Sequence, residues 1–274
     1  MLMIRERLVT IAILFIILTI AFGIIEGIFP SITNQQKWRK GVWLDSFYWF
    51  FTLLISHLLS AVCIAIVIVP LFLVLGRSID PQILKSSYGL AANLPQWVQG
   101  LMVIVIADFI GYWTHRWLHS SRLWDIHAVH HTSEELDWLS SVRVHPLNDI
   151  FSRVMQSLPI LLLGFSPLSV EIYTPFLIFY LAFTHSNVPW NYGPFRYLIV
   201  SPVFHRWHHS KDTEGIGKNF AALFPVFDLM FGTFYLPAGK QPKNFGVHGD
   251  AIPEKFGKHL FYPFRKQIKI RFDV

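Results

Sequence analysis

Two long stretches without a charged side chain restrict what this sequence can fold into. The first lies between Arg7 and Glu26, and the second lies between Asp45 and Arg77. A run of about 18 or more apolar residues is long enough to cross the hydrocarbon core of a bilayer, which is roughly 30 Å thick. Hydrophobic residues make up 53% of the chain and charged residues only 15%. The sequence therefore predicts an integral membrane protein.

Three membrane-spanning helices are expected in the first half of the chain, at about residues 8–28, 48–76 and 97–114. Tryptophans flank these segments, as is typical of the membrane–water interface, at Trp43, Trp49 and Trp97. The first apolar run is longer than the 7–15 residues of a signal peptide, so we interpret it as an uncleaved span. The single cysteine, Cys63, lies in the second run, which excludes an intramolecular disulfide.

Two shorter apolar stretches follow, at about 150–164 and 168–185, and a Gly-Phe-Ser-Pro sequence separates them. Gly and Pro so close together indicate a turn, so we expect a helical hairpin that enters and leaves the membrane on one side. The expected fold class is an all-α integral membrane protein with three transmembrane spans, this hairpin and a cytosolic helical cap. We expect three regions along the chain. They are an N-terminal transmembrane region (1–104), a catalytic region that includes the membrane hairpin 150–185 (105–236) and a basic tail (237–274).

The distribution of Lys and Arg favours a cytosolic position for the segments 115–149 and 186–274. With the N-terminus outside, the internal side holds 18 Lys and Arg residues and the external side holds four, Arg5, Arg7, Arg77 and Lys85. Without the long tail the preference falls to 6 against 4.

The formal net charge of +6 comes largely from the end of the chain, which carries eight Lys and Arg against three Asp and Glu from Lys240 onward. This composition suits contact with an anionic lipid surface, although a solvated charged tail is an alternative. Because the basic residues lie beside apolar spans rather than on a soluble domain, nucleic acid is not an expected partner.

Ten of the thirteen histidines lie between residues 115 and 209, and most of them fall into three spaced boxes. The first box is an HxxxH sequence and the other two are HxxHH sequences. The boxes consist of His115 and His119, then His127, His130 and His131, then His205, His208 and His209. Two isolated histidines, His145 and His185, stand between the second and third boxes.

Helical spacing explains why such boxes favour metal binding. Residues at i, i+3 and i+4 share one face of a helix, so HxxxH aims two imidazoles at one point and HxxHH aims three. Ten imidazoles supply about five nitrogens for each of two metal ions and leave an open position on each ion. Without a cation, so many converging imidazoles would each need a hydrogen-bond partner and would repel one another if charged. For the lone histidines, His57, His248 and His259, an ordinary core or surface role is expected.

The boxes and their surroundings resemble the fatty acid hydroxylase/sterol desaturase superfamily over roughly residues 105 to 236. Besides the boxes, the resemblance includes the segments at 108–116, 219–220 and 227–234. The stretch from His127 to Glu135, with Asp137 and Arg143 beyond it, is most similar to the branch that contains alkylglycerol monooxygenases and many bacterial members.

The resemblance implies a histidine-ligated di-iron centre that uses O₂ to hydroxylate or desaturate a C–H bond of a lipid. It implies that the box histidines are ligands, and that an isolated histidine completes the set, which leaves His145 and His185 as alternatives. The substrate classes that it allows are a sterol, a fatty acyl chain, a carotenoid and a glyceryl ether. Because the chain has no HPGG-type haem-binding sequence and no dinucleotide-binding glycine loop, a separate reductase or cytochrome is expected to supply electrons.

Ligating imidazoles normally donate their second N–H to a carboxylate or a carbonyl. On this ground the candidates for a supporting role around the metal ligands are Asp108, Glu134, Asn187 and Asp228. Three tryptophans, Trp113, Trp117 and Trp207, are candidates either for walls of the site or for interfacial anchors.

Three other functions are compatible with a histidine-rich membrane protein. A metal transporter or metal-binding protein without oxygenase activity is the principal alternative, but transport sites usually lie near the bilayer midplane. A bis-histidine haem protein needs two to four axial ligands rather than ten. A zinc hydrolase is disfavoured because no HExxH sequence occurs.

Overall fold

The computed structural model describes residues 2–76, 87–89, 91–248, 252 and 254–265. Within these ranges the fold is all-helical, and the only β-type pairing is an isolated bridge between Ser210 and Phe245. Arg77 and Lys85, which entered the charge count, and the end of the basic tail lie outside the described residues. The predicted fold class is confirmed in its helical content and its long apolar helices.

Three helical segments are long and apolar enough to cross a membrane, Arg5–Ile28, Val42–Val74 and Gln96–Leu118. The first belongs to α1 (Leu2–Ile28) and the third is α4 (Gln96–Leu118). The second runs without a break through α2 (Val42–Phe50), the π-helical turn η1 (Phe51–Ser56) and α3 (His57–Val74). The three predicted spans are therefore present, and the second begins several residues earlier than expected.

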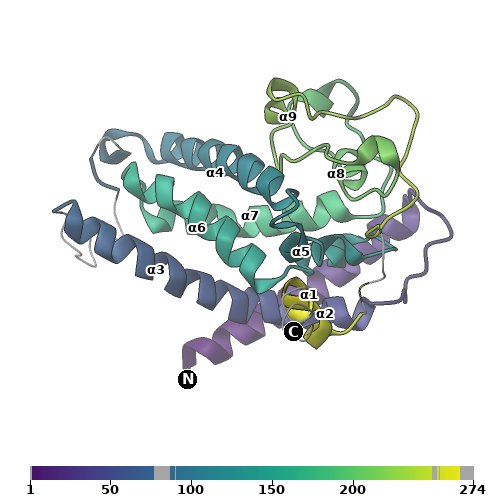
Figure 1. Ribbon diagram of the computed structural model, residues 1–274, viewed down its shortest axis with the longest axis horizontal. Helices are drawn as coiled ribbons and strands as arrows, with labels where there is room; N and C mark the ends of the chain where they lie inside the picture. The colour runs from purple at the N-terminus through teal and green to yellow at the C-terminus, as the bar shows by residue number, and fades with distance from the viewer. Residues whose placement is uncertain (1, 77–86, 90, 249–251, 253, 266–274) are drawn as a thin grey trace, which may run out of the picture.

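The predicted hairpin consists of α6 (Pro146–Leu162) and α7 (Pro167–His185), and α6 packs against both α3 and α4 (Figure 1). Its turn contains Gly164 in the left-handed backbone region, with φ of +95°. The backbone N–H of Tyr88 donates a hydrogen bond to the Gly164 carbonyl, so the turn lies beside the segment that leads into α4. Since α4 begins there, the hairpin returns its two ends to the side on which α4 terminates.

Short helical turns form a cap over that side of the bundle, and Figure 1 shows α5, α8 and α9 gathered around the C-terminal half of α4. The α-helices of the cap are α5 (Trp124–His127), α8 (Pro202–His208), α9 (Val226–Met230) and α10 (Phe256–Phe261). Its short 3₁₀ turns are η3 (His130–Thr132), η4 (Trp138–Val142), η5 (Gly193–Tyr197), η6 (Thr213–Gly215) and η7 (Tyr262–Phe264). A further turn, η2 (Ala91–Asn93), precedes α4.

A buried network of ion pairs attaches the cap to α2. Arg39 pairs with Asp45 and with Asp137, at 2.6 Å in each case, and Arg143 pairs with Asp45 through its Nε atom. Removing one partner of such a buried pair would leave an uncompensated charge, at a cost of about 3–5 kcal/mol. The network therefore fixes η4 between Asp137 and Arg143, and Arg143 also donates a hydrogen bond to Thr132 Oγ1 at 3.0 Å, next to the second histidine box.

Candidate metal centre

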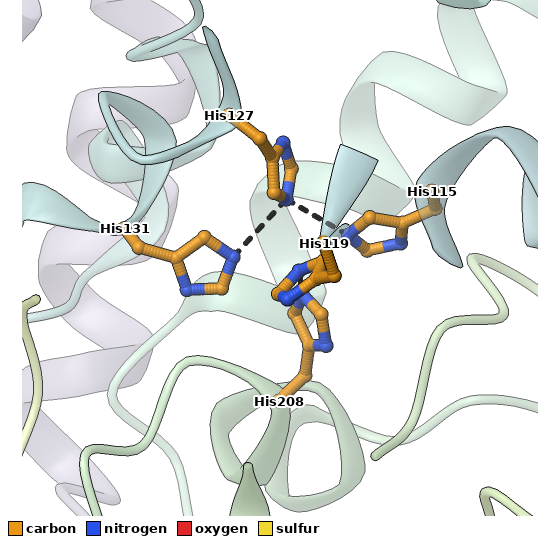
Figure 2. A group of neighbouring side chains, drawn as sticks. All are labelled: His115, His119, His127, His131 and His208. Carbon is orange, nitrogen blue, oxygen red and sulfur yellow. Dashed lines mark hydrogen bonds between the residues drawn. The ribbon is translucent and has the colours of Figure 1, made fainter. Parts of the chain in front are cut away.

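The fold brings nine of the ten candidate histidines together in two neighbouring groups, within each of which the ligand nitrogens all lie within 4.8 Å of one another. Group one consists of His115, His119, His127, His131 and His208. Group two consists of His130, His185, His205 and His209. Figure 2 shows the five imidazoles of group one directed towards a common centre from α4, α5, η3 and α8.

The two HxxHH boxes each contribute to both groups, which corrects the expectation that their three imidazoles meet at one point. His127 and His131 belong to group one while His130 belongs to group two, and His205 and His209 belong to group two while His208 belongs to group one. Consecutive residues of a helical turn point about 100° apart, so adjacent histidines diverge. The rings of His208 and His209 are accordingly perpendicular, with an interplanar angle of 90°.

Neighbouring Nε2 atoms within each group are close together. In group one the distances are 3.1 Å for His115–His127, 3.1 Å for His127–His131 and 3.2 Å for His119–His208 (Figure 2). In group two they are 3.3 Å for His130–His185, 3.2 Å for His185–His205 and 3.1 Å for His205–His209. Imidazole nitrogens bind a divalent cation at about 2.1 Å, which places two adjacent donors on one cation roughly 3.0–3.4 Å apart. The observed spacings match that separation.

The second nitrogen of five of these rings has a fixed partner. In group one the Nδ1 atoms of His115, His127 and His208 face the Phe220 carbonyl at 2.7 Å, the Asn148 Oδ1 atom at 2.7 Å and the Lys218 carbonyl at 2.8 Å. In group two the Nδ1 atoms of His130 and His185 face the carbonyls of Arg143 at 3.2 Å and Leu181 at 2.7 Å. A backbone carbonyl only accepts hydrogen bonds, so the Nδ1 atoms of His115, His208, His130 and His185 carry the proton. The Oδ1 atom of Asn148, with the amide oriented as it is here, assigns the same tautomer to His127.

This tautomer leaves an unprotonated lone pair on the Nε2 atom of each of the five rings. In two pairs, His115–His127 and His130–His185, both partners are fixed in this way, so neither Nε2 atom can donate to the other. Two lone pairs held about 3 Å apart in a buried place repel each other unless a cation lies between them. One such pair occurs in each group, and the residues present therefore fit two bound metal ions.

Burial also keeps the imidazoles in the neutral form that binds metals. Burial lowers the pKa of six cap histidines well below the usual value, and the neighbouring histidines lower these pKa values further. The six are His127, His130, His131, His205, His208 and His209. A neutral imidazole is the form that coordinates transition metals.

His145 lies outside both groups. It is the N-cap of α6, where its Nδ1 atom accepts a hydrogen bond from the backbone N–H of Leu147 at 3.1 Å. Its Nε2 atom faces the carbonyl of Leu260, the residue next to the end of α10, at 3.1 Å. Of the two isolated histidines, the structure thus places His185, and not His145, among the clustered imidazoles. The other lone histidines, His57, His248 and His259, are also outside both groups.

Two of the carboxylates expected to support the ligands contact backbone N–H groups instead of imidazoles. Asp108 accepts hydrogen bonds from the backbone of residues 222–224, and Asp228 accepts them from Phe220 and Ala221. Together they hold five consecutive N–H groups of the loop whose Phe220 carbonyl faces His115. Their effect on the metal ligands is therefore indirect.

The other two supporting candidates also have different surroundings. The Asn187 side chain forms two hydrogen bonds with the backbone of Ile32, which tie the end of α7 to the segment after α1. Glu134 is exposed, and no hydrogen bond within the described part of the chain links it to an imidazole. The contact between Asn148 and His127 is not indicated by any sequence pattern, apart from the position of Asn148 three residues after His145. The backbone carbonyls that face the other Nδ1 atoms cannot be identified from a sequence.

The aromatic walls of group one are Trp124 and Phe220 rather than the tryptophans considered from the sequence. The Trp124 ring lies 5.1 Å from the His119 ring and 5.3 Å from the His131 ring. Phe220 lies 5.1 Å from His119 and 5.6 Å from His208. Trp113 packs against Phe231, Trp117 is exposed near the end of α4, and Trp207 packs against Tyr235.

The sequence that contains this site is similar to those of a known protein family and of several known proteins. Residues 100–233, which contain all nine clustered histidines, match the fatty acid hydroxylase family. The chain is 30% identical over 177 residues to an ornithine lipid hydroxylase of Rhizobium tropici, covering 63% of this chain and 53% of that protein. It is 34% identical over 129 residues to human alkylglycerol monooxygenase, covering 46% of this chain and 28% of that protein.

A very-long-chain aldehyde decarbonylase of Oryza sativa is also similar, with 32% identity over 174 residues, 61% of this chain and 62% of that protein. The chain thus spans about half the length of the first relative and less of the second. No solved structure matches the chain.

Proposed function

Since residues 100–233 form a fatty acid hydroxylase domain and the chain belongs to that family, we propose that it is a membrane-bound di-iron oxygenase that inserts oxygen into a C–H bond of a lipid. The observation that carries the proposal is the pair of lone-pair contacts, one in each histidine group. Iron is among the metals that imidazole ligands suit, and the family favours it over zinc, nickel or copper.

In this proposal the five histidines of group one hold one iron and the four of group two hold the other. When bound, the two irons supply the reduction of O₂ and the oxidising power that acts on the C–H bond. The chain contributes the orientation of the donors, because Asn148 and the carbonyls of residues 143, 181, 218 and 220 fix five imidazoles in one tautomer. Mutation of such hydrogen-bond partners typically lowers metal affinity or activity by about 10–100-fold.

The two groups are close enough to act as one centre. The stacked rings of His131 and His209, from different groups, lie 4.4 Å apart, and both side chains are buried. Trp124 and Phe220 cover part of group one, where they limit the access of water. A dry site protects a reactive species from side reactions with solvent.

A lipid substrate follows from the position of the centre and from the relatives. Group one begins at His115, in the last turn of the membrane-spanning helix α4, so an acyl chain in the bilayer can approach it laterally. The relatives named above act, by their names, on an ornithine lipid, an alkylglycerol and a long-chain aldehyde. The names hydroxylase and monooxygenase favour hydroxylation over desaturation.

The electron donor in this proposal is a separate reductase or cytochrome, and the histidine side of the bundle faces the cytosol, where such donors are found. A transport function is disfavoured by the position of the histidine groups. Eight of the nine clustered histidines lie at or beyond the ends of helices on one side of the bundle, and the ninth, His115, is three residues from the end of α4.

The experiment that tests this function uses the full chain in lipid vesicles, loaded with iron and supplied with a reductant, ¹⁸O₂ and a bacterial lipid extract. We expect one ¹⁸O atom in a lipid product, with a mass gain of 18 relative to the substrate. His131→Ala and His209→Ala should abolish this product, whereas His248→Ala, outside both groups, should not. Iron-loaded protein that binds both metals but yields only unlabelled lipid from every lipid class would overturn the proposal.

A further inference from the structure

The segment that follows the third histidine box runs beside α4 although it is not one of the three spans. The Phe109 ring of α4 lies 5.3 Å from Phe227 and 6.4 Å from Phe231, and the Trp113 ring lies 4.7 Å from Phe231. A helix rises about 1.5 Å per residue, so Phe109 is roughly 14 Å inside the end of α4 at Leu118. Because the hydrocarbon core is about 30 Å thick, α9 lies beside a part of α4 that is within the apolar layer.

The outward face of α9 is apolar. Val226, Leu229 and Met230 are exposed by 42%, 45% and 65%. In Figure 1, α9 lies at the edge of the molecule, on the side of α4 away from α3. A five-residue helix that exposes three large apolar side chains to water would be unusual, whereas the same face is suited to lipid.

The turn η5 lies next to this segment and also exposes apolar side chains, while its one charged residue, Arg196, is half-buried with its guanidinium 5.1 Å from the Tyr197 ring. The backbone N–H of Val200 donates to the Leu223 carbonyl at 2.9 Å, and the Tyr197 ring lies 5.5 Å from the Phe234 ring. Phe195 and Leu198 are exposed by 63% and 65%. We define Phe195, Leu198, Val226, Leu229 and Met230 as the lateral apolar patch.

The lipid-facing surface of α4 continues onto this patch. Leu101, Val105 and Phe109 are exposed at successive four-residue steps along one face of α4. Phe109, the last of them, is the residue whose ring contacts Phe227 and Phe231. The α9 part of the patch is thus contiguous with the exposed apolar face of α4.

The backbone of the same segment meets the requirement for irregular structure at membrane depth. Non-helical backbone there must have its N–H groups paired inside the protein, since lipid offers no partner. Asp108 and Asp228 accept hydrogen bonds from all five N–H groups of residues 220–224, at 2.7–3.1 Å. A water-exposed loop would not need two carboxylates for this purpose, because water would satisfy its N–H groups.

We propose that α9 and the turn at residues 195–198 are immersed among the acyl chains of the leaflet nearest to the histidine groups, with the lateral apolar patch in direct contact with phospholipid. The cap is then anchored in the bilayer by a further non-spanning element beside α4, in addition to the α6–α7 hairpin. The anchoring rests on packing and burial, and it holds whether or not the chain is an oxygenase.

A labelling experiment tests this placement. In a Cys63→Ser background, single cysteines at Met230, at Val105 on α4 and at Glu214 on the exposed turn η6 are labelled with a fluorophore in phosphatidylcholine vesicles. We expect the label at position 230 to be quenched by a nitroxide on the acyl chain as strongly as the label at 105, and to be protected from iodide. Quenching like that at position 214, strong with iodide and weak with the acyl nitroxide, would overturn the proposal.

A measurement on the unsubstituted chain removes any dependence on how the variants fold. The protein is reconstituted in phosphatidylcholine that carries a photoactivatable carbene precursor on its acyl chain, and adducts are located by mass spectrometry. Lipid adducts on residues 226–230 are expected. Adducts restricted to the three spans and the α6–α7 hairpin would contradict the placement. Cross-links between two copies of the chain through this patch, in place of lipid adducts, would also contradict it.

Discussion

The Nε2 atoms of His130 and His185 lie 3.3 Å apart although neither can donate a hydrogen bond to the other. Both Nδ1 atoms face backbone carbonyls, those of Arg143 and Leu181. The same relationship holds between His115 and His127 in the other group, where Phe220 and Asn148 provide the acceptors. Two separate helical segments in each group are thus held with their lone pairs opposed, which is the arrangement that a bound cation stabilises.

Loss of one histidine from either group should remove one metal ion and leave the other. His131→Ala affects group one and His205→Ala affects group two, because each ring contacts neighbours within its own group. We expect each variant to retain about one metal ion per chain when the metal content of purified protein is determined. His248→Ala is the control, since that side chain is exposed and faces the Lys211 carbonyl. Unchanged content in both group variants would exclude the two-group assignment.

Asn148 should affect metal affinity although it is not a ligand. Its Oδ1 atom fixes the tautomer of His127, so Asn148→Ala is expected to weaken binding at group one by about 10–100-fold, measured by competition with a chelator. Asn148→Asp keeps an acceptor at that position and should restore most of the affinity. Asn191→Ala, on an exposed turn, provides the matched control. Equal affinity in the Ala and Asp variants would show that the contact with His127 does not matter.

His145 should contribute to stability rather than to metal binding. His145→Ala removes the side-chain acceptor at the N-terminus of α6, and loss of a helix cap typically costs about 1 kcal/mol. We expect a lower free energy of unfolding in detergent and full metal content. His145→Asn offers an acceptor for the Leu147 N–H and should recover part of the loss. Should the Ala variant purify with one metal ion fewer, His145 would belong to the ligand set after all.

The buried histidines predict a pH dependence for the metal-free protein. Burial lowers the pKa of six cap histidines, among them His127, His131 and His208, while in the unfolded chain their pKa is about 6.5. Below that pH the unfolded state binds more protons than the folded state, so the free energy of unfolding falls as the pH falls. The free energy of unfolding of chelator-treated protein should therefore stay constant between pH 8 and pH 7 and fall progressively towards pH 5.

The control for this pH profile is the same measurement with metal bound. Coordination stabilises the folded state but leaves the pKa of the unfolded histidines at about 6.5, so the free energy of unfolding should be higher at every pH and should still begin to fall near that value. A metal-free protein whose stability increases towards pH 5 would contradict the burial of neutral imidazoles.

The spans and the histidine boxes could be predicted from the sequence because both depend on local features. The length of an apolar run decides whether it can cross a membrane, and the spacing of four residues puts His115 and His119, or His127 and His131, into the same group. The preference for a metal site over a set of core histidines followed from the number of boxes alone.

The division of each HxxHH box between two groups could not be predicted. It depends on the direction in which each short turn enters the cap. His130 and His208 each belong to a different group from the other two histidines of their box, because side chains one residue apart on a helical turn point in different directions. The role of Asp108 was misassigned for a related reason. Its partners are backbone N–H groups more than 110 positions later, and backbone groups leave no signature in a sequence.

Metal analysis of the purified chain, after anaerobic loading with iron and together with a visible absorption spectrum, tests the two-metal centre most directly. We expect two iron atoms per chain and no Soret band of haem. A content of one iron or none in folded protein, or a Soret band, would contradict a centre built from the two histidine groups.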